Sequence, residues 1–173
     1  MYQKKDVVSI FCGEDLVLIF IKCYYPQMIF FCFYFFIGCE STAPLQLYIS
    51  EFMSHNTMAH KNDLGEYSDW IEIHNAGRQP INLEGFGLSD DEKKPSRWKF
   101  PYVVLESDAR MVVYASNANR RDPSQALHTN FRLKRNGERL LLTDNHNSVL
   151  HTIPPVDMWA NISFGYPEFG AKG

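Results

Sequence analysis

Carboxylate side chains that could bind a cation lie in and beside short β-like segments. Asp69 and Glu72 belong to one segment, and the adjacent Asp90 and Asp91 follow another. Carboxylate oxygens are preferred ligands of Ca²⁺, but the Asp-x-Asp-x-Asp-Gly spacing of a calcium loop does not occur in the sequence. Short polar side chains at strand ends commonly accept backbone N–H bonds in turns. We therefore predict turn roles, keep Asp90 and Asp91 as minor calcium candidates, and expect no cofactor.

Nucleophiles, bases and metal-binding side chains form no recognisable catalytic or zinc pattern. The six histidines are His55, His60, His74, His128, His146 and His151. His55 and His60 lie in a predicted loop and match neither the i, i+4 spacing of a helical zinc site nor the i, i+2 spacing of a strand. The sequence contains no Gly-x-Ser-x-Gly, no phosphate-binding glycine loop and no kinase signature set. We predict that the chain is not an enzyme by itself.

Aromatic side chains are the stronger candidates for binding chemistry. Trp70 should lie on the face of its segment opposite Ile71 and Ile73, while Tyr67 and Tyr102 fall near predicted strand ends. Exposed aromatic rings beside hydrogen-bonding groups suit sugar rings or pockets of a partner protein. The alternative for Trp70 is packing at an edge of the fold, as for Trp98. Tyr67, Trp70 and Tyr102 are the predicted ligand contacts.

The elements that must position these residues are short strands. Segments 47–53 and 69–75 alternate apolar and polar residues, which predicts strands. Further short β-like segments, separated by turns, follow at 97–100, 138–143 and 148–153. Residues 111–115 are apolar on both faces, which predicts a place in the middle of a sheet. Residues 144–147, Asp-Asn-His-Asn, are typical of a tight hairpin. Because no stretch of the body sustains a helical period, an all-β sandwich is predicted.

The first 38 residues differ from the rest. An uncharged apolar run at 28–37 follows Lys4, Lys5 and Lys22, and is too short to cross a bilayer. The run ends in Phe-Ile-Gly-Cys at 36–39, which resembles a bacterial lipobox with Phe where Leu is usual. Residues 1–38 are therefore predicted to be a lipoprotein-type signal peptide, with lipidation at Cys39. The alternative is an uncleaved membrane anchor over 16–37, and a wrongly assigned start codon upstream of Met28 would fit either interpretation.

Either interpretation places the remaining chain outside the cytoplasm, associated with the cell envelope. Residues 39–46 are polar with one proline and are predicted to be a tether. The four cysteines all lie at or before position 39, so the body offers no thiolate for zinc or for nucleophilic attack. The 173 residues have room for one domain, and the net charge of −3 without a basic stripe argues against nucleic-acid binding.

Several blocks resemble the bacterial form of the lamin tail domain. They are LYISEFM at 47–53, GEYSDWIEI at 65–73, LEGFGLSDD at 83–91, WKFP at 98–101 and HTNFRL at 128–133. The resemblance spans roughly 47–153 and implies an immunoglobulin-like β-sandwich. It also implies that His128 braces a neighbouring loop, and that the module serves adhesion or targeting on secreted or surface proteins.

Such domains often stand beside spore-coat-protein-H-type kinase domains, nucleases or other hydrolases. Here residues 154–173 form a C-terminal extension that stops where multidomain relatives continue. Two functions are therefore predicted. The first is a non-catalytic cell-surface attachment module, lipid-anchored, that binds a carbohydrate, an extracellular polymer or a protein. The alternative is the targeting domain of a truncated larger secreted enzyme.

Overall fold

The structure, a computed structural model, describes residues 8–13, 16–21 and 46–165. The chain divides into two compact units, Met1–Pro44 and Leu45–Gly173. In the first unit, β1 (Val8–Gly13) and β2 (Leu16–Ile21) pair as an antiparallel hairpin. The predicted apolar run at 28–37 and the lipidation candidate Cys39 lie outside the described residues. No helix in the described part is long and apolar enough to cross a membrane.

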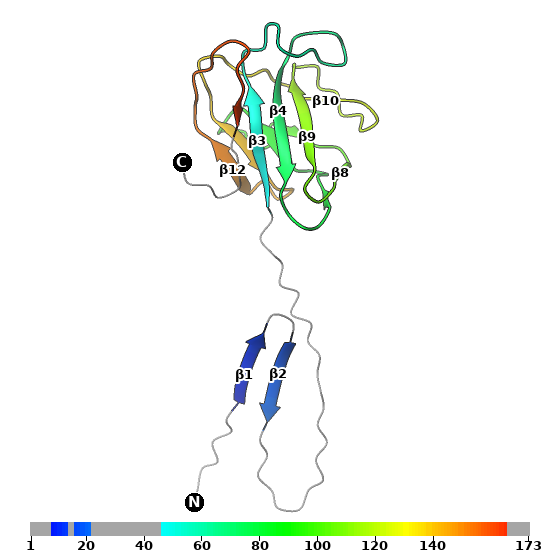
Figure 1. Ribbon diagram of the computed structural model, residues 1–173, viewed down its shortest axis with the longest axis vertical. Coiled ribbons are helices and arrows are strands. Elements are labelled where there is room, and N and C mark those ends of the chain that lie inside the picture. The colour runs from blue at the N-terminus through cyan, green and yellow to red at the C-terminus, as the bar shows by residue number, and fades with distance from the viewer. Residues whose placement is uncertain (1–7, 14–15, 22–45, 166–173) are drawn as a thin grey trace, which may run out of the picture. The chain divides into compact units, whose positions relative to one another are not determined.

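The second unit is a sandwich of two principal sheets (Figure 1). The five-stranded sheet has the order β10 (Leu127–His128), β9 (Arg110–Ala115), β4 (Asp69–Asn75), β3 (Leu47–Met53) and β13 (Phe164–Gly165). The four-stranded sheet has the order β12 (Val149–Ile153), β11 (Leu140–Thr143), β6 (Gly87–Ser89) and β7 (Trp98–Lys99). A small ladder joins β5 (Ile81–Asn82) to β8 (Val104–Leu105). The described residues form strands and no helix, so the all-β prediction is confirmed.

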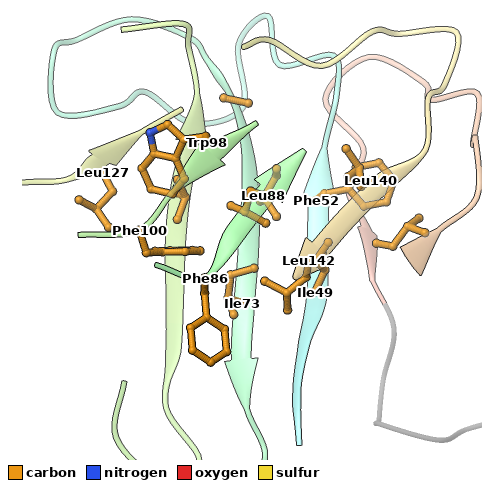
Figure 2. Close-up of a cluster of buried hydrophobic side chains, with 14 of the residues drawn as sticks. Ile49, Phe52, Ile73, Phe86, Leu88, Trp98, Phe100, Leu127, Leu140 and Leu142 are labelled. Atoms are coloured by element: carbon orange, nitrogen blue, oxygen red, sulfur yellow. The ribbon is translucent and has the colours of Figure 1, made fainter. Parts of the chain in front are cut away.

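The core lies between the two sheets (Figure 2). Ile71 and Ile73 are buried in it, as the alternation of their segment predicts. Trp98 is also buried and packs edge-to-face on Phe100, with 4.8 Å between the ring centroids. The packing role considered for Trp98 is therefore confirmed.

A β-bulge lets β3 bury both of its halves. The register with β4 shifts between Ile49 and Glu51, so that Ile49 faces Ile73 and Phe52 faces Ile71. Without the extra residue, Phe52 would fall on the opposite face from Ile49. Ser50, the extra residue, donates through Oγ to the Glu72 carboxylate at 2.6 Å.

The two sheets also meet along one side of the sandwich, at β3 and β12. The backbone N–H of Ile49 donates to Nδ1 of His151, at 3.3 Å. The His151 ring lies edge-on to Tyr48, with centroids 5.9 Å apart. Burial at this junction lowers the pKa of His151 below its ordinary value. His151 is therefore neutral where it accepts the backbone hydrogen bond.

The predicted hairpin at 144–147 is present between β11 and β12. The Asp144 carboxylate accepts the backbone N–H groups of His146 and Ser148, and Asn147 takes a positive φ of 66°. Asparagine tolerates this left-handed conformation better than most residues.

The prediction that residues 111–115 lie inside a sheet is confirmed, because β9 pairs with β10 on one side and with β4 on the other. Val112 is nonetheless 39% exposed, since it lies on the face of β9 opposite the buried Val113. The predicted end of the domain at residue 153 needs correction. The sheet continues past residue 153, because Phe164 and Gly165 pair with Phe52 and Glu51.

Candidate functional site

The candidate site lies at the end of the sandwich where β3 ends. β3 runs for seven residues from Leu47 to Met53, about 20 Å at the rise of a strand. The loop at 54–68, which joins β3 to β4, and the loop that follows β9 lie together at this end, at the top in Figure 1. They are therefore on the side of the domain opposite the start of β3.

Two asparagines hold the 54–68 loop in one conformation. Asn56 donates through Nδ2 to the carbonyls of His60 and Ser68, at 2.6 and 2.8 Å, and its Oδ1 accepts the N–H of Ala59. Asn62 repeats this arrangement further along the loop. Its Oδ1 accepts the backbone N–H groups of residues 64 and 66, and its Nδ2 donates to Ser68 Oγ. The loop is thus cross-linked by its own amides.

An open, polar cavity of about 410 Å³ lies against this loop. One wall is formed by Asn56 and residues 66–69, and the other by residues 115–116 at the end of β9 together with Arg132. Its size falls within the range of small-ligand sites, roughly 300 to 1,000 Å³.

Opposite charges face each other in the cavity. Burial raises the pKa of Asp69 above its ordinary value, although the backbone N–H of Asn56 donates to Oδ1 at 3.1 Å. The Arg132 guanidinium favours the ionised form of this carboxyl. Arg132 is exposed and donates through Nε to the Ser116 carbonyl at 3.0 Å, which fixes its direction. Asp69 and Arg132 thus offer an acceptor and a planar set of donors across one space.

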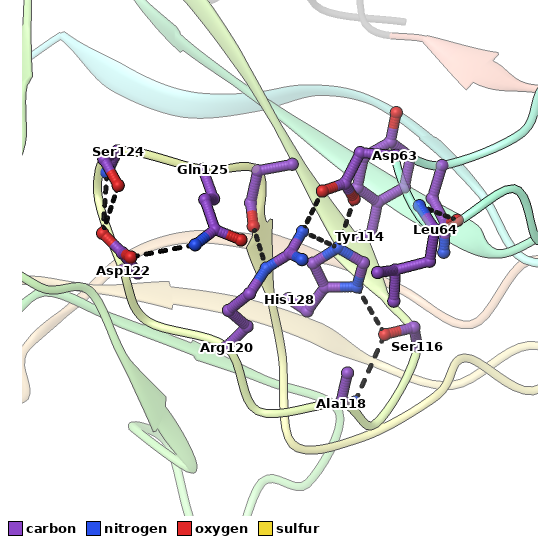
Figure 3. A network of polar contacts seen from close by, with 12 residues as sticks. Asp63, Leu64, Tyr114, Ser116, Ala118, Arg120, Asp122, Ser124, Gln125 and His128 are labelled. Atoms are coloured by element: carbon purple, nitrogen blue, oxygen red, sulfur yellow. Dashed lines mark hydrogen bonds and ion pairs between the residues drawn. The ribbon is translucent and has the colours of Figure 1, made fainter.

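A hydrogen-bonded chain centred on His128 fastens the loop to the sheet (Figure 3). The ring is fully buried, its Nδ1 lies 2.7 Å from Ser116 Oγ, and its Nε2 lies 2.9 Å from Asp63 Oδ1. Arg120 forms an ion pair with Asp63 and contacts the same ring nitrogen at 2.8 Å. The hydrogen-bond contact with His128, and then the Arg120 guanidinium, hold the pKa of Asp63 below its ordinary value. Asp63 is therefore an ionised anchor for the loop.

Ser116, His128 and Asp63 are the residue types of a hydrolytic triad, and their bonds run from hydroxyl to imidazole to carboxylate. Two features oppose that chemistry. Arg120 neutralises Asp63, the group that would have to stabilise a protonated imidazole. Ser116 Oγ also accepts the backbone N–H of Ala118, at 3.2 Å, which holds the hydroxyl within its own turn. The chain of bonds therefore joins three segments of backbone.

A second histidine has the same kind of contacts at the other end of β9. His74 is buried, its Nδ1 lies 3.0 Å from the Tyr48 hydroxyl, and its Nε2 lies 2.9 Å from Asp108 Oδ1. Asp108 stands in the short turn before β9, has a positive φ of 59°, and its side chain is 89% exposed.

The sequence matches the model of a known protein family. The family model of the Lamin Tail Domain matches residues 40–157, more than half of the chain. The chain belongs to the lamin tail domain family. Lamin tail domains are immunoglobulin-like modules that are not typically catalytic, in agreement with the sandwich and with the bracing contacts of His128. Comparison with curated proteins gives no match.

Of the three predicted ligand contacts, this lamin tail domain brings one to the cavity. Tyr67 lines it and is 45% exposed. Trp70 is half-buried on the outer face of β4, and Tyr102, although 62% exposed, follows β7 of the other sheet. Neither Trp70 nor Tyr102 is among the residues that line the cavity. The three aromatics therefore do not form one surface.

The calcium candidates of the lamin tail domain occupy a turn. Both oxygens of Asp90 lie within 2.9 Å of Arg97 Nη1, and the Asp91 carboxylate accepts the N–H of Lys93. Among the residues that the structure describes, no three His, Cys, Asp or Glu side chains are grouped so that they could hold a metal ion. Asp91 makes the backbone contact expected of a turn residue, whereas Asp90 forms an ion pair with the Arg97 side chain.

Sequence reasoning missed Asn56, Asn62 and Asp63, which organise the loop of the lamin tail domain. The loop was predicted, but no role was assigned to these three residues. The available signal was local: Asn62 and Asp63 stand just before Gly65, which adopts a positive φ of 79°. Asparagine and aspartate near such a glycine are typical of a compact turn.

Proposed function

We propose that this lamin tail domain is a non-catalytic attachment module, held at the outer surface of a membrane through its N-terminal segment. In this proposal Cys39 carries the lipid, and residues 39–46 form the tether that leads into β3. The loop end of the sandwich contacts an extracellular carbohydrate, polymer or protein.

The observation that carries this proposal is the direction of β3. The strand begins at Leu47, just after the proposed tether, and ends at Met53, where the ordered loop and the cavity begin. A domain tethered at its Leu47 end would present the opposite end outward. Binding residues are disproportionately found on loops that a rigid scaffold positions, and the sandwich is such a scaffold.

Replacement of the proposed lipid site tests the anchoring. The change Cys39→Ser should abolish labelling by a fatty-acid analogue and move the protein from the membrane fraction to the soluble fraction. Cys32→Ser, four residues before the Phe-Ile-Gly-Cys block, is the matched control and should leave both unchanged. Membrane retention of the Cys39→Ser variant would reject lipidation and favour the uncleaved anchor.

A further inference from the structure

The lining of the loop-end cavity restricts the chemistry of its ligand. Its walls carry carboxylate, guanidinium, hydroxyl and amide groups, and few apolar atoms. An apolar ligand would remove these groups from water without offering them hydrogen bonds, which is unfavourable for each group left unpaired. The cavity therefore suits a ligand that is itself rich in hydrogen-bonding groups.

The charged side chains that line the cavity restrict the class of ligand further. Glu66 and Asp69 supply two carboxylates, against the single guanidinium of Arg132 among the lining residues. A phosphorylated or sulfated ligand would meet repulsion from both carboxylates. A ligand with many hydroxyls can instead accept from the fork of donors on Arg132 and donate to the oxygens of Asp69.

An exposed aromatic ring completes the arrangement. Tyr67 stands beside these polar groups with nearly half of its surface exposed. Its backbone pairs with Lys61, and the Lys61 ammonium lies 5.2 Å from the ring centroid. An exposed ring held in place beside planar hydrogen-bonding side chains offers a stacking surface for the C–H face of a pyranose.

The wall that carries Tyr67 is formed before any ligand arrives. Asn56 and Asn62 cross-link the loop, and Asp63 ties it to His128 and Arg120. A preformed wall lowers the entropy lost on binding, which matters most for ligands that bind through a few hydrogen bonds.

We propose that this cavity is a saccharide-binding site for neutral or amino sugars, in which Tyr67 stacks on the ring and Asp69 and Arg132 bind its hydroxyls. This inference rests on the proposed attachment function and names the ligand class of the same loop end. Substitution of exposed side chains at the rim of the cavity should abolish saccharide binding without unfolding the domain.

Calorimetric titration of the full-length chain in detergent tests the proposal. The probes are cellotetraose, the glucosamine tetramer, the N-acetylglucosamine tetramer and, as a polyanion, heparin. At least one of the three tetramers should bind, and more tightly than heparin. Tyr67→Ala and Arg132→Lys should each weaken that binding about tenfold, because one loses the stacking surface and the other the planar pair of donors.

Tyr102→Ala is the matched control, since it removes an exposed tyrosine that does not line the cavity. It should leave the affinity unchanged, and all variants should melt like the parent. If Arg132→Lys unfolds, Glu66→Gln on the exposed rim replaces it. Three results would overturn the proposed site. They are no binding of any of the three tetramers, tighter binding of heparin than of the tetramers, or an equal loss of tetramer affinity in Tyr102→Ala.

The failure of this inference is distinguishable from failure of the attachment function. A chain that stays on membranes through Cys39 and binds a protease-sensitive extracellular partner, but no tetramer, keeps the attachment function and rejects the saccharide site. A chain that binds a tetramer through Tyr67 but is not retained at a membrane keeps the site and rejects the anchoring.

Discussion

The two ends of the five-stranded sheet are each fastened by a buried histidine, yet the two contacts hold very different structures. His74 links the Tyr48 hydroxyl to Asp108, and His128 links the Ser116 hydroxyl to Asp63. Asp108 belongs to a short turn before β9 and its side chain is almost fully exposed. Asp63 belongs to the long loop at 54–68, is 38% exposed, and has Arg120 as a second partner.

The same contact between a buried histidine and an aspartate serves two purposes in this domain. At the Leu47 end it closes the short turn that connects β8 to β9. At the Met53 end it holds a loop that forms the wall of a cavity. A buried His–Asp pair by itself therefore says little about function, and the structure that the aspartate fixes is what matters.

A substitution in the hydrophobic core, which supports both ends of the sheet, should have the largest effect on stability. His74 belongs to β4, and His128 belongs to β10, which joins β4 through β9 in the same sheet. Ile71 of β4 is buried in the core. Ile71→Ala should lower the free energy of unfolding by about 2 to 5 kcal/mol, because it removes buried methyl groups and leaves a cavity. Denaturant titration measures this loss. Val112→Ala, on the partly exposed face of the adjacent β9, should cost less than about 0.5 kcal/mol. Equal costs would contradict the facing of β4 and β9.

A matched pair of substitutions separates the two histidine contacts. Asp63→Asn removes the charge that pairs with Arg120 and should weaken tetramer binding about tenfold, because the wall that carries Tyr67 loosens. Asp108→Asn removes the corresponding charge at the other end and should leave binding unchanged. Hydrogen exchange of the amides at 54–68 should accelerate in the first variant only. If both variants bind and exchange alike, the cavity does not depend on the His128 contact.

The smallest expected effect concerns pH and the junction of the sheets. The pKa of His151 is lowered by burial, so the unfolded chain binds a proton that the folded chain resists. The stability contribution is therefore complete above the ordinary pKa of about 6.5 and is lost as pH falls from there toward the lowered folded value. Melting temperature should decline over this window in the parent.

His151→Asn should flatten that decline, because its amide oxygen can accept the Ile49 N–H without titrating. His146→Asn, in the exposed hairpin turn, is the control and should decline like the parent. A decline of equal slope in the His151→Asn variant would show that another group is responsible.

The alternation of apolar and polar residues predicted the longer strands, because in these segments the alternation extends over enough residues to be recognised. Strands at 47–53 and 69–75 alternate over several residues, and both are present where the alternation predicts them. β10 and β13 have two residues each, too few to show a period, so their existence depends on tertiary contacts. The bulge at Ser50 was equally hidden, because its role is clear only once Ile49 and Phe52 are both known to face the core.

The candidate site was less accessible to sequence reasoning. Tyr67 was predicted as a ligand contact on its residue type and lies at the cavity. Tyr102 was chosen on the same grounds and lies elsewhere, because residue type near a strand end does not specify which sheet the strand joins. Ser116, His128 and Asp63 are far apart in the sequence, and their meeting depends on how two loops fold over one end of the sheet.

The pairing of β13 with β3 determines how the domain would respond to mechanical load. Phe164 and Gly165 run antiparallel to Phe52 and Glu51, so β13 points back toward the end of the sheet where β3 begins. A force applied between residues 46 and 165 would act at the same end of two antiparallel strands. It would therefore break the hydrogen bonds between β13 and β3 one after another and not all at once. β13 would peel off first and separate the Phe164 ring from Phe52, which now lie with their centroids 5.8 Å apart. Tension would thus uncover the backbone edge of β3, and further opening would pull on Asn161, whose side chain accepts the N–H groups of residues 57 and 58 in the 54–68 loop.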